Sequence, residues 1–448
     1  MTDYGERPLR FASYTLGCKV NQYETEALEE ALMAEGFSPW TEGEDSADLI
    51  LINTCTVTNM SDRKSRQVIR RMKKEHPRAK VCVAGCYVQT HPEELEAMEE
   101  VDLLVGTKDR GAFVPAVQGL IRGEEQEHAI EAHRQGELFE SMSVTNTQER
   151  TRAYLKVQDG CNQYCSYCII PYARGFIRSR DLEEAVAEAK KLMEGGFREI
   201  VVTGIHVGSY GKEAGEGPQL IDLLEALGET GVERIRLSSV EPMTMTEEFM
   251  ERLSKIPAFM PHFHLSLQSG SEKVLREMNR KYTKEEYRET VARIRRHYAH
   301  PGITTDIIVG FPGETEEEFE ETEEFVRSIG FHRIHIFPYS PREGTPAAQR
   351  KDQIPGDVKK DRVHQLEKVA RAMAREAGRE LLGLEVPVLV EEWDGSYGYG
   401  YTPNYLRVRI PLEEDRHNEI LCVTIEKQVA ASSEELLEGL LATEFSGR

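Results

Sequence analysis

The sequence lacks long apolar runs and is poor in positive charge. Its longest apolar runs, such as residues 303–311, are far shorter than the roughly 20 residues of a membrane-spanning helix, and no secretory signal stands at its start. Against 78 aspartates and glutamates there are 56 lysines and arginines, a formal net charge of −22. We therefore expect a cytoplasmic protein without a membrane partner, and no general affinity for nucleic acid.

A disulfide framework is also missing, because the eight cysteines gather in short motifs. Three of them, Cys161, Cys165 and Cys168, are spaced by four and three residues. Iron–sulfur cubes are normally closed by four thiolates, so three in one tight loop predict a cluster with an open iron. The alternatives are a zinc knuckle or free thiols. Zinc usually takes two cysteine pairs or Cys/His sets, and no fourth ligand lies nearby in sequence.

Three further cysteines each follow a predicted strand in residues 8–125. This region alternates short apolar strands, at 11–16, 49–53 and 81–84, with helices, which predicts a parallel sheet. Ligands collect at the carboxyl ends of such strands. We therefore expect Cys18, Cys55 and Cys86 to converge on a second open-iron site.

Two other residues of this region are given structural roles. Cys82 lies inside a strand and is expected to pack in the core. A closed four-cysteine site that includes Cys82 is the alternative, although a strand would hold it roughly 13 Å from Cys86. Asn21 is expected to cap the helix that runs to Ala34 and buries Leu28 and Leu32.

Residues 151–378 repeat a strand–helix rhythm six times, which predicts a partial (β/α)6 barrel. Active sites of such barrels lie at the carboxyl ends of the strands. The residues expected at those ends are Cys161, Thr203, Gly204, Ser238, Ser239, Gln268, Gly310 and Tyr339.

Residues 126–150 are polar and charged and are expected to form a linker. Residues 379–446 contain short predicted strands at 384–391, 405–410 and 420–427, which indicates a small all-β module. The predicted fold class is therefore α/β, with a parallel-sheet domain, a partial barrel and an all-β C-terminal domain.

These motifs resemble the radical S-adenosylmethionine (SAM) methylthiotransferases. The resemblance rests on residues 15–24, 53–55, 85–87 and 160–171, and it extends over nearly the whole chain. It implies an N-terminal methylthiotransferase domain, a radical SAM barrel and a C-terminal TRAM domain. Residues 17–24, GCKVNQYE, are similar to the branch that modifies N6-threonylcarbamoyladenosine. The isopentenyladenosine branch usually reads GCQMN there, and the branch acting on a ribosomal protein GCPKN.

The resemblance implies two [4Fe-4S] clusters and SAM as cofactors, and no side chain acting as a general acid or base. The cluster at Cys161, Cys165 and Cys168 would bind SAM, and the cluster at Cys18, Cys55 and Cys86 would carry sulfur. The cofactors supply the radical chemistry, while the protein supplies position. A flavodoxin- or ferredoxin-type electron donor and a sulfur donor are implied as partners. SAM contacts, or ordinary strand-end turns, are expected at Tyr167, Thr203, Gly204, His206, Ser239, Gln268 and Gly310.

The function that this resemblance implies is methylthio transfer to C2 of N6-threonylcarbamoyladenosine, at position 37 immediately 3′ of the tRNA anticodon. The rival substrates are isopentenyladenosine tRNA and an aspartate of a ribosomal protein. A rival of another class is a non-catalytic RNA-binding or cluster-storage protein, which would not cleave SAM.

Candidate RNA contacts come from two places. A basic stretch, opposed in sequence only by Glu75, predicts either an RNA-facing helix or a solvated one; its members include Arg63, Lys64, Arg66, Arg70, Arg71, Lys73 and Lys74. The acidic C-terminal module offers residues suited to base stacking, namely Tyr401, Tyr405, Arg407 and Arg409. Arg174 and Arg178 can meet RNA phosphate, the SAM carboxylate or nearby acidic side chains.

Overall fold

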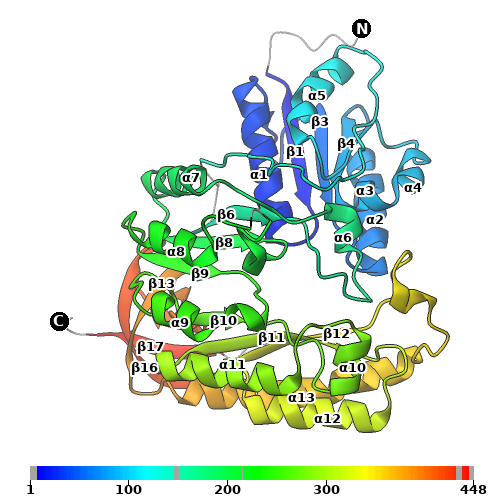
Figure 1. The fold of residues 1–448 in the computed structure, drawn as a ribbon. Coiled ribbons are helices and arrows are strands. Elements are labelled where there is room, and N and C mark those ends of the chain that lie inside the picture. The colour runs from blue at the N-terminus through cyan, green and yellow to red at the C-terminus, as the bar shows by residue number, and fades with distance from the viewer. Residues whose placement is uncertain (1–7, 146–150, 214, 430–435, 443–448) are drawn as a thin grey trace.

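The computed structural model describes residues 8–145, 151–213, 215–429 and 436–442. Figure 1 shows three parts: an N-terminal sheet flanked by helices, a curved set of strands below it, and a β-barrel that ends the chain. No helix among the described residues is long and apolar enough to cross a membrane.

The N-terminal sheet is parallel and has the strand order β2-β1-β3-β4-β5. Helices cover both faces: α1 and α5 pack on Leu49, Leu51 and Cys82, whereas α2, α3 and α4 pack on the opposite side chains. Cys82 is thus a core residue, as expected. The elements are β1 (Arg10–Thr15), α1 (Lys19–Ala34), β2 (Ser38–Pro39), β3 (Leu49–Thr54), α2 (Asn59–Glu75), β4 (Lys80–Gly85), α3 (Cys86–Thr90), α4 (Pro92–Glu96), β5 (Leu103–Val105), η1 (Arg110–Ala112) and α5 (Phe113–Ile121).

The prediction that Asn21 caps α1 is wrong. The helix begins at Lys19, directly after Cys18, so Asn21 lies inside the first turn. Its buried amide donates to Asn53 Oδ1 at 3.1 Å and to the carbonyl oxygen of Thr54 at 3.0 Å. A buried amide needs such partners, and these bonds fasten the start of α1 to the end of β3.

The middle part contains the six parallel strands that the sequence predicts. They form two hydrogen-bonded sheets, joined by a bridge between Val240 and Leu265, with the short strand β7 antiparallel at one edge. The strands are β6 (Arg152–Asp159), β7 (Arg178–Ser179), β8 (Glu199–Gly204), β9 (Arg234–Leu237), β10 (His262–His264), β11 (Gly302–Val309) and β12 (Arg333–Pro338).

Helices cover the outer face of these strands. Two of them, α11 and α12, begin with capping boxes at Thr283/Glu286 and Thr315/Glu318, which satisfy the first backbone N–H groups. The helices are α6 (Ile170–Arg174), α7 (Leu182–Glu194), η2 (Val207–Ser209), α8 (Leu220–Gly228), η3 (Pro242–Thr244), α9 (Glu247–Leu253), α10 (Glu272–Glu277), α11 (Lys284–His297), α12 (Glu316–Ile329), η4 (Pro346–Gln349) and α13 (Gly356–Arg379).

Solvent reaches the inner face of this partial barrel. Along β11, Ile303, Ile307 and Val309 face the helices and are fully buried. The alternate residues Asp306 and Ile308 face inward and are only half-buried. The strand alternation thus separates a dry outer core from an accessible inner wall.

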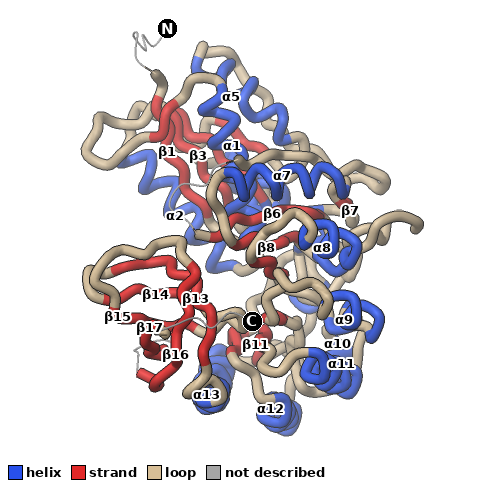
Figure 2. The backbone as a smooth tube through the Cα atoms, turned by 90° about the vertical axis from the view of Figure 1, so that its left-hand side faces the viewer, coloured by secondary structure: helices blue, strands red, loops and turns tan. Residues whose placement is uncertain are grey.

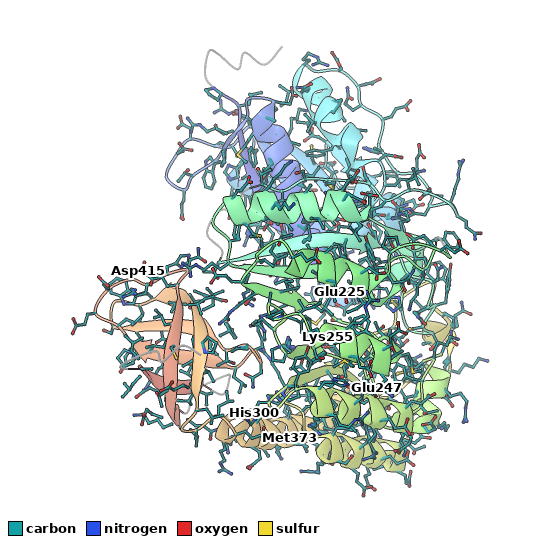
Figure 3. All side chains as sticks on the ribbon, turned by 60° about the vertical axis from the view of Figure 1, so that its left-hand side comes forward. Glu225, Glu247, Lys255, His300, Met373 and Asp415 are labelled. Atoms are coloured by element: carbon teal, nitrogen blue, oxygen red, sulfur yellow. The ribbon has the colours of Figure 1, made fainter. Side chains whose placement is uncertain are left out.

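The C-terminal part is a closed five-stranded barrel with the order β13-β14-β15-β17-β16. Figure 2 shows it beside α13, apart from the N-terminal sheet, and Figure 3 shows His300 and Met373 close to it. The sequence did not predict strand β14, because this strand alternates tyrosine with glycine. Glycine is needed at position 400, where a Cβ would lie 2.1 Å from the Leu389 carbonyl oxygen. The strands are β13 (Glu385–Trp393), β14 (Tyr397–Tyr401), β15 (Arg407–Pro411), β16 (Ile420–Val429) and β17 (Leu436–Leu441).

Candidate active site

The first group of thiols gathers at one edge of the N-terminal sheet. Cys18, Cys55 and Cys86 follow β1, β3 and β4, three adjacent parallel strands. Burial, together with the nearby Cys86 and Cys18 thiols, raises the pKa of Cys55 to about 12. Gly85, which precedes Cys86, allows the end of β4 to lie close to β3. Its φ is +103°, and a Cβ there would lie 2.4 Å from Asn53 Oδ1.

Arg174 is a fully buried side chain that reaches this group from the barrel. Its Nε donates to Cys86 Sγ at 3.1 Å, and its two terminal nitrogens bind Glu24 at 2.5 and 3.0 Å. Among RNA phosphate, the SAM carboxylate and nearby acidic side chains, Arg174 therefore pairs with an acidic side chain. Its guanidinium also lines one side of the thiol group.

Glu24 and Asp159 are the two carboxylates of this buried network. Lys156 Nζ lies 2.7 Å from an oxygen of each, and Arg110 lies 3.0 Å from Glu24. Burial alone would raise the pKa of Glu24, but Arg110, Arg174 and Lys156 outweigh it and lower the pKa to about 2. Because Glu24 belongs to α1 and Asp159 to β6, the network joins the N-terminal sheet to the barrel.

The second group of thiols lies in the loop after β6, at the carboxyl end of the first barrel strand. Burial raises the pKa of Cys161 to about 11 and that of Cys168 to about 12. The loop is held from several sides: Cys161 N–H donates to the Gly175 carbonyl, and Ser166 N–H to the Met278 carbonyl. At Gly160 the φ is +74°, and a Cβ would lie 1.9 Å from the Phe176 carbonyl oxygen.

Arg280 serves this second group much as Arg174 serves the first. Its Nη1 donates to Cys165 Sγ at 3.2 Å, and its Nη2 lies 2.8 Å from both oxygens of Glu241. It is nearly buried, and its guanidinium also lies over the Tyr282 ring. Arg280 was not among the residues singled out from the sequence, and no spacing relative to the cysteines points to it.

The expected SAM contacts largely share the strand ends beside this loop. Thr203 and Gly204 end β8, Ser239 follows β9 and is exposed, and Gln268 adopts φ +72°. Gly310 follows β11 with φ +69°, and its N–H donates to Glu314 at 2.6 Å.

His206 has a buried polar atom without a hydrogen bond to any described residue, whereas Tyr167 lies in an apolar environment. The pKa of His206 is lowered to about 4, chiefly by burial and then by Lys212 and Arg280, and its buried Nε2 has no hydrogen-bond partner within the described chain. A buried polar atom without a partner marks a place where a ligand or water belongs. Tyr167 instead packs against a small apolar cluster that contains Phe311 and Tyr339.

Comparison with known proteins agrees with this geometry. A family model described as "Radical SAM superfamily" matches residues 155–326, and one described as "Uncharacterized protein family UPF0004" matches residues 10–106. Threonylcarbamoyladenosine tRNA methylthiotransferase MtaB of Bacillus subtilis is 41% identical over 93% of both chains. The chain belongs to the radical SAM methylthiotransferase family.

Two other relatives of this methylthiotransferase are named for two different tRNA nucleosides. MtaB of Aquifex aeolicus is 40% identical over 86% of this chain and 93% of its own. The tRNA-2-methylthio-N(6)-dimethylallyladenosine synthase of Pelotomaculum thermopropionicum is 36% identical over 88% of this chain and 90% of its own. In fold, the enzyme is similar to the radical SAM methyltransferase TsrM of Kitasatospora setae, with a TM-score of 0.58, 15% identity and coverage of 87% and 79% of the two chains.

The residues present fit the family's cofactors, two [4Fe-4S] clusters and SAM. Each thiol group supplies three soft ligands, which is one fewer than a closed cube takes. Each also has a buried arginine donating to one sulfur, the kind of outer contact that orients and stabilises thiolate ligands. The buried His206 Nε2 lies 3.9 Å from Glu241 and forms no hydrogen bond within the described chain, so it remains available to a polar cofactor.

The basic helix α2 of the methylthiotransferase is less free than its sequence indicates. Arg66 lies 2.7 Å from Glu94, Arg70 3.9 Å from Glu100, and Lys73 3.7 Å from Asp102. Arg71 lies 3.9 Å from Glu75 and over the Tyr14 ring. Glu94, Glu100 and Asp102 come from later segments, so the fold adds acidic partners to Glu75, the one acidic residue within the basic stretch. Within the described chain, the members of the helix without an ion pair are Arg63, Lys64 and Lys74.

Two of the tyrosines expected to stack on RNA have partners within the chain. Tyr401 and Tyr405 stack with centroids 4.6 Å apart, and Tyr405 also stacks on His262 at 4.7 Å. Arg152 lies over both rings. They therefore seal the C-terminal barrel against the partial barrel, because their large faces gain more from this contact than from solvent. Arg407 and Arg409 remain at the surface, where they lie over Tyr399 and Tyr397 and pair with Glu392 and Glu438.

Arg178, which the sequence left open, and Arg342 are structural. Arg178 donates to the Arg174 and Phe176 carbonyls. Arg342 is buried and reaches Asp62 and Thr56 at 2.5 Å, so it ties the segment after β12 to α2.

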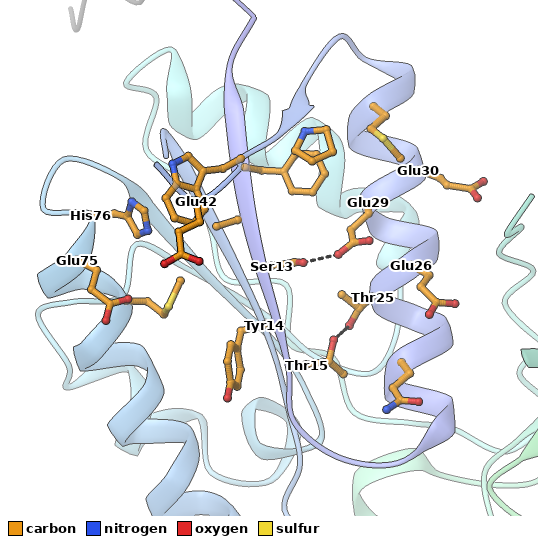
Figure 4. Close-up of a pocket in the computed structure, with 17 residues that line it drawn as sticks. Ser13, Tyr14, Thr15, Thr25, Glu26, Glu29, Glu30, Glu42, Glu75 and His76 are labelled. Atoms are coloured by element: carbon orange, nitrogen blue, oxygen red, sulfur yellow. Dashed lines mark hydrogen bonds between the residues drawn. The ribbon is translucent and has the colours of Figure 1, made fainter. Parts of the chain in front are cut away.

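A cavity of about 650 Å³ lies away from this chemistry, between β1, α1 and α2 (Figure 4). Its lining includes no cysteine and carries several carboxylates, among them Glu26, Glu29 and Glu75. Such a lining repels phosphate, and we assign it no part in the reaction.

Proposed function

We propose that this methylthiotransferase adds a methylthio group to C2 of N6-threonylcarbamoyladenosine at position 37 of tRNA. The observation that carries the proposal is the 41% identity, over 93% of both chains, to a relative named for that activity. A dimethylallyladenosine synthase is 36% identical, so isopentenyladenosine tRNA is the substrate to test against. The relatives' names thus support tRNA as the substrate class.

We assign one cluster to each thiol group: Cys161, Cys165 and Cys168 for the barrel cluster, and Cys18, Cys55 and Cys86 for the auxiliary one. When bound, the clusters and SAM supply radical and sulfur chemistry. The chain's own part is to hold them. Arg280 and Arg174 each donate a charge-assisted hydrogen bond to one sulfur of the respective group. SAM is assigned to the strand ends with Thr203, Gly204, His206, Ser239, Gln268 and Gly310.

For tRNA we assign the exposed cations of α2. Exchanging Arg63 and Lys64 for glutamate should weaken tRNA binding about tenfold or more at 0.1 M salt, because phosphate contacts dominate nucleic-acid affinity. The matched control exchanges Lys190 and Lys191, exposed on α7, for glutamate and should leave affinity unchanged. Equal losses in the two double variants would remove α2 from the RNA surface.

We also assign the setting, the partners and the functional units of the chain. We place the enzyme in the cytoplasm, with an external flavodoxin- or ferredoxin-type electron donor and a separate sulfur donor. The functional units are residues 8–125, the connecting residues 126–150, the barrel residues 151–378 and the TRAM domain 379–446.

The substrate assignment is tested by mass spectrometry of nucleosides. The reconstituted enzyme is incubated without oxygen with SAM, sulfide, reductant and tRNA carrying threonylcarbamoyladenosine or, in parallel, isopentenyladenosine. A methylthio gain on the threonylcarbamoyl nucleoside alone is expected. Gain only on the isopentenyl nucleoside, or SAM cleavage with gain on neither, would overturn the assignment.

A further inference from the structure

The inner wall of the partial barrel is polar and unused by the two thiol groups. His264 on β10, Asp306 on β11 and His335 on β12 are half-buried, with ligand atoms that all lie within 4.8 Å of one another. His264 Nε2 lies 3.2 Å from Asp306 Oδ2, and its Nδ1 lies 3.0 Å from Thr304 Oγ1. An apolar guest would strip water from these groups without replacing their hydrogen bonds.

Lys19 is the first residue of α1, a helix of the N-terminal part that packs against β6 and β8 of the barrel. It directly follows Cys18, yet its ammonium lies near the Arg152, Arg236 and Glu199 side chains of the barrel, and it also acts on His262. Its side chain is accessible to solvent. Lys19 therefore projects from the auxiliary thiol group into the accessible interior of the barrel.

Positive charge around Lys19 is in excess. Glu199 already accepts Arg236 at 2.8 Å and lies 3.7 Å from both Arg152 and Arg234. Lys19 itself forms no hydrogen bond or close ion pair with any residue that the structure describes. Because the nearby carboxylate of Glu199 is already engaged by these arginines, a lysine beside them attracts a further anion.

The proposed substrate carries such an anion on N6, close to the carbon C2 that reacts. In adenine, C2 and C6 flank the same ring nitrogen, so whatever reads the group on N6 must lie beside the residues that act at C2. The threonylcarbamoyl group ends in a carboxylate, whereas the isopentenyl group is neutral and apolar. Lys19 is one residue from a thiol of the auxiliary group, where sulfur would be delivered to C2.

We propose that Lys19 is a specificity residue that binds the carboxylate of the N6-threonylcarbamoyl group inside the barrel. The inference rests on the proposed function, and it goes further by naming the residue and the charge that select the substrate. A site whose cation pairs with a charge on the substrate binds an analogue without that charge more weakly, since the ion pair is lost. The wall formed by His264, Asp306 and His335 keeps the surroundings polar and disfavours the isopentenyl group.

The test compares three anticodon stem-loop RNAs that differ only on N6: threonylcarbamoyl, its neutral threoninamide counterpart, and isopentenyl. For holoenzyme and variants, RNA affinity is measured by fluorescence anisotropy and methylthio product by mass spectrometry. The unmodified enzyme should prefer the carboxylate over the carboxamide at least tenfold in both measurements. Lys19→Gln should lose at least tenfold on the carboxylate RNA and less than threefold on the carboxamide RNA, and Lys19→Arg should retain the preference.

Three controls separate the possible failures. Lys190→Gln, on the outer helix α7, should leave all three RNAs unaffected, and the iron content of Lys19→Gln should equal that of the unmodified enzyme. Equal losses on both threonyl RNAs, or an unchanged preference, would overturn the role of Lys19 while leaving the proposed function standing. Failure of the unmodified enzyme to act on the threonylcarbamoyl RNA would instead overturn the proposed function.

Discussion

The two thiol groups of this enzyme have the same size but opposite origins. Cys161, Cys165 and Cys168 come from one loop, whose spacing alone brings them together. Cys18, Cys55 and Cys86 come from three strands and span 69 residues of sequence; only the parallel order of β1, β3 and β4 unites them. One group is therefore encoded by local spacing and the other by topology.

Both groups nevertheless have one buried arginine that donates to a single sulfur. Arg280 is held by one carboxylate, Glu241, and belongs to the same barrel as its cysteines. Arg174 belongs to the barrel but serves a cysteine of the N-terminal sheet, and it shares Glu24 and Asp159 with other cations. The group of Cys18, Cys55 and Cys86 is thus completed by an arginine from the barrel, so its structure depends on the contact between the N-terminal sheet and the barrel.

The largest effect should follow from removing the arginine that crosses this boundary. Arg174→Met leaves two buried carboxylates short of a partner, which costs about 3–5 kcal/mol when one member of a buried pair is removed. Urea unfolding followed by circular dichroism measures the loss. Arg122→Met, which breaks an exposed pair with Glu124, should leave the midpoint unchanged, and an equally mild effect of Arg174→Met would mean that the network does not hold the two parts together.

A smaller and more local effect is expected at the barrel group. In Arg280→Lys the charge stays, but the two-oxygen contact with Glu241 and the bond to Cys165 are lost, because an ammonium cannot reproduce a planar fork. Changes in such outer partners typically cost about 10- to 100-fold in metal affinity or activity. Formation of 5′-deoxyadenosine from SAM should fall by that factor while the iron held by the N-terminal group is retained. Full activity in this variant would show that Arg280 only packs.

The smallest effect concerns the order in which apo thiols react. Cys18 is exposed, whereas Cys55 and Cys86 are buried, and burial raises the pKa of both buried thiols. Since the thiolate is the reactive form, iodoacetamide at pH 8 should label Cys18 first, and raising the pH should speed labelling of the other two. Peptide mapping over time gives the order; equal rates at all three positions would contradict the burial described for this group.

These contrasts show which parts of the molecule can be predicted from sequence. The six barrel strands follow from the repeated alternation of apolar strands and helices, and the strand ends then locate both cysteine groups. Arg174 and Glu24 stand 150 residues apart, so no local pattern connects them. Composition also misassigned Tyr401 and Tyr405, because a stacking face looks the same in sequence whether it meets a base or, as here, Arg152 and His262.

We expect the two groups to divide the work, with the barrel group cleaving SAM and the N-terminal group needed only for the sulfur step. Single-turnover assays of Cys165→Ala and Cys86→Ala, each scored for 5′-deoxyadenosine and for methylthiolated nucleoside, test it most directly. Cys165→Ala should yield neither product, whereas Cys86→Ala should still yield 5′-deoxyadenosine but no methylthiolated nucleoside. Loss of 5′-deoxyadenosine in a folded Cys86→Ala enzyme that retains its barrel cluster would contradict the division.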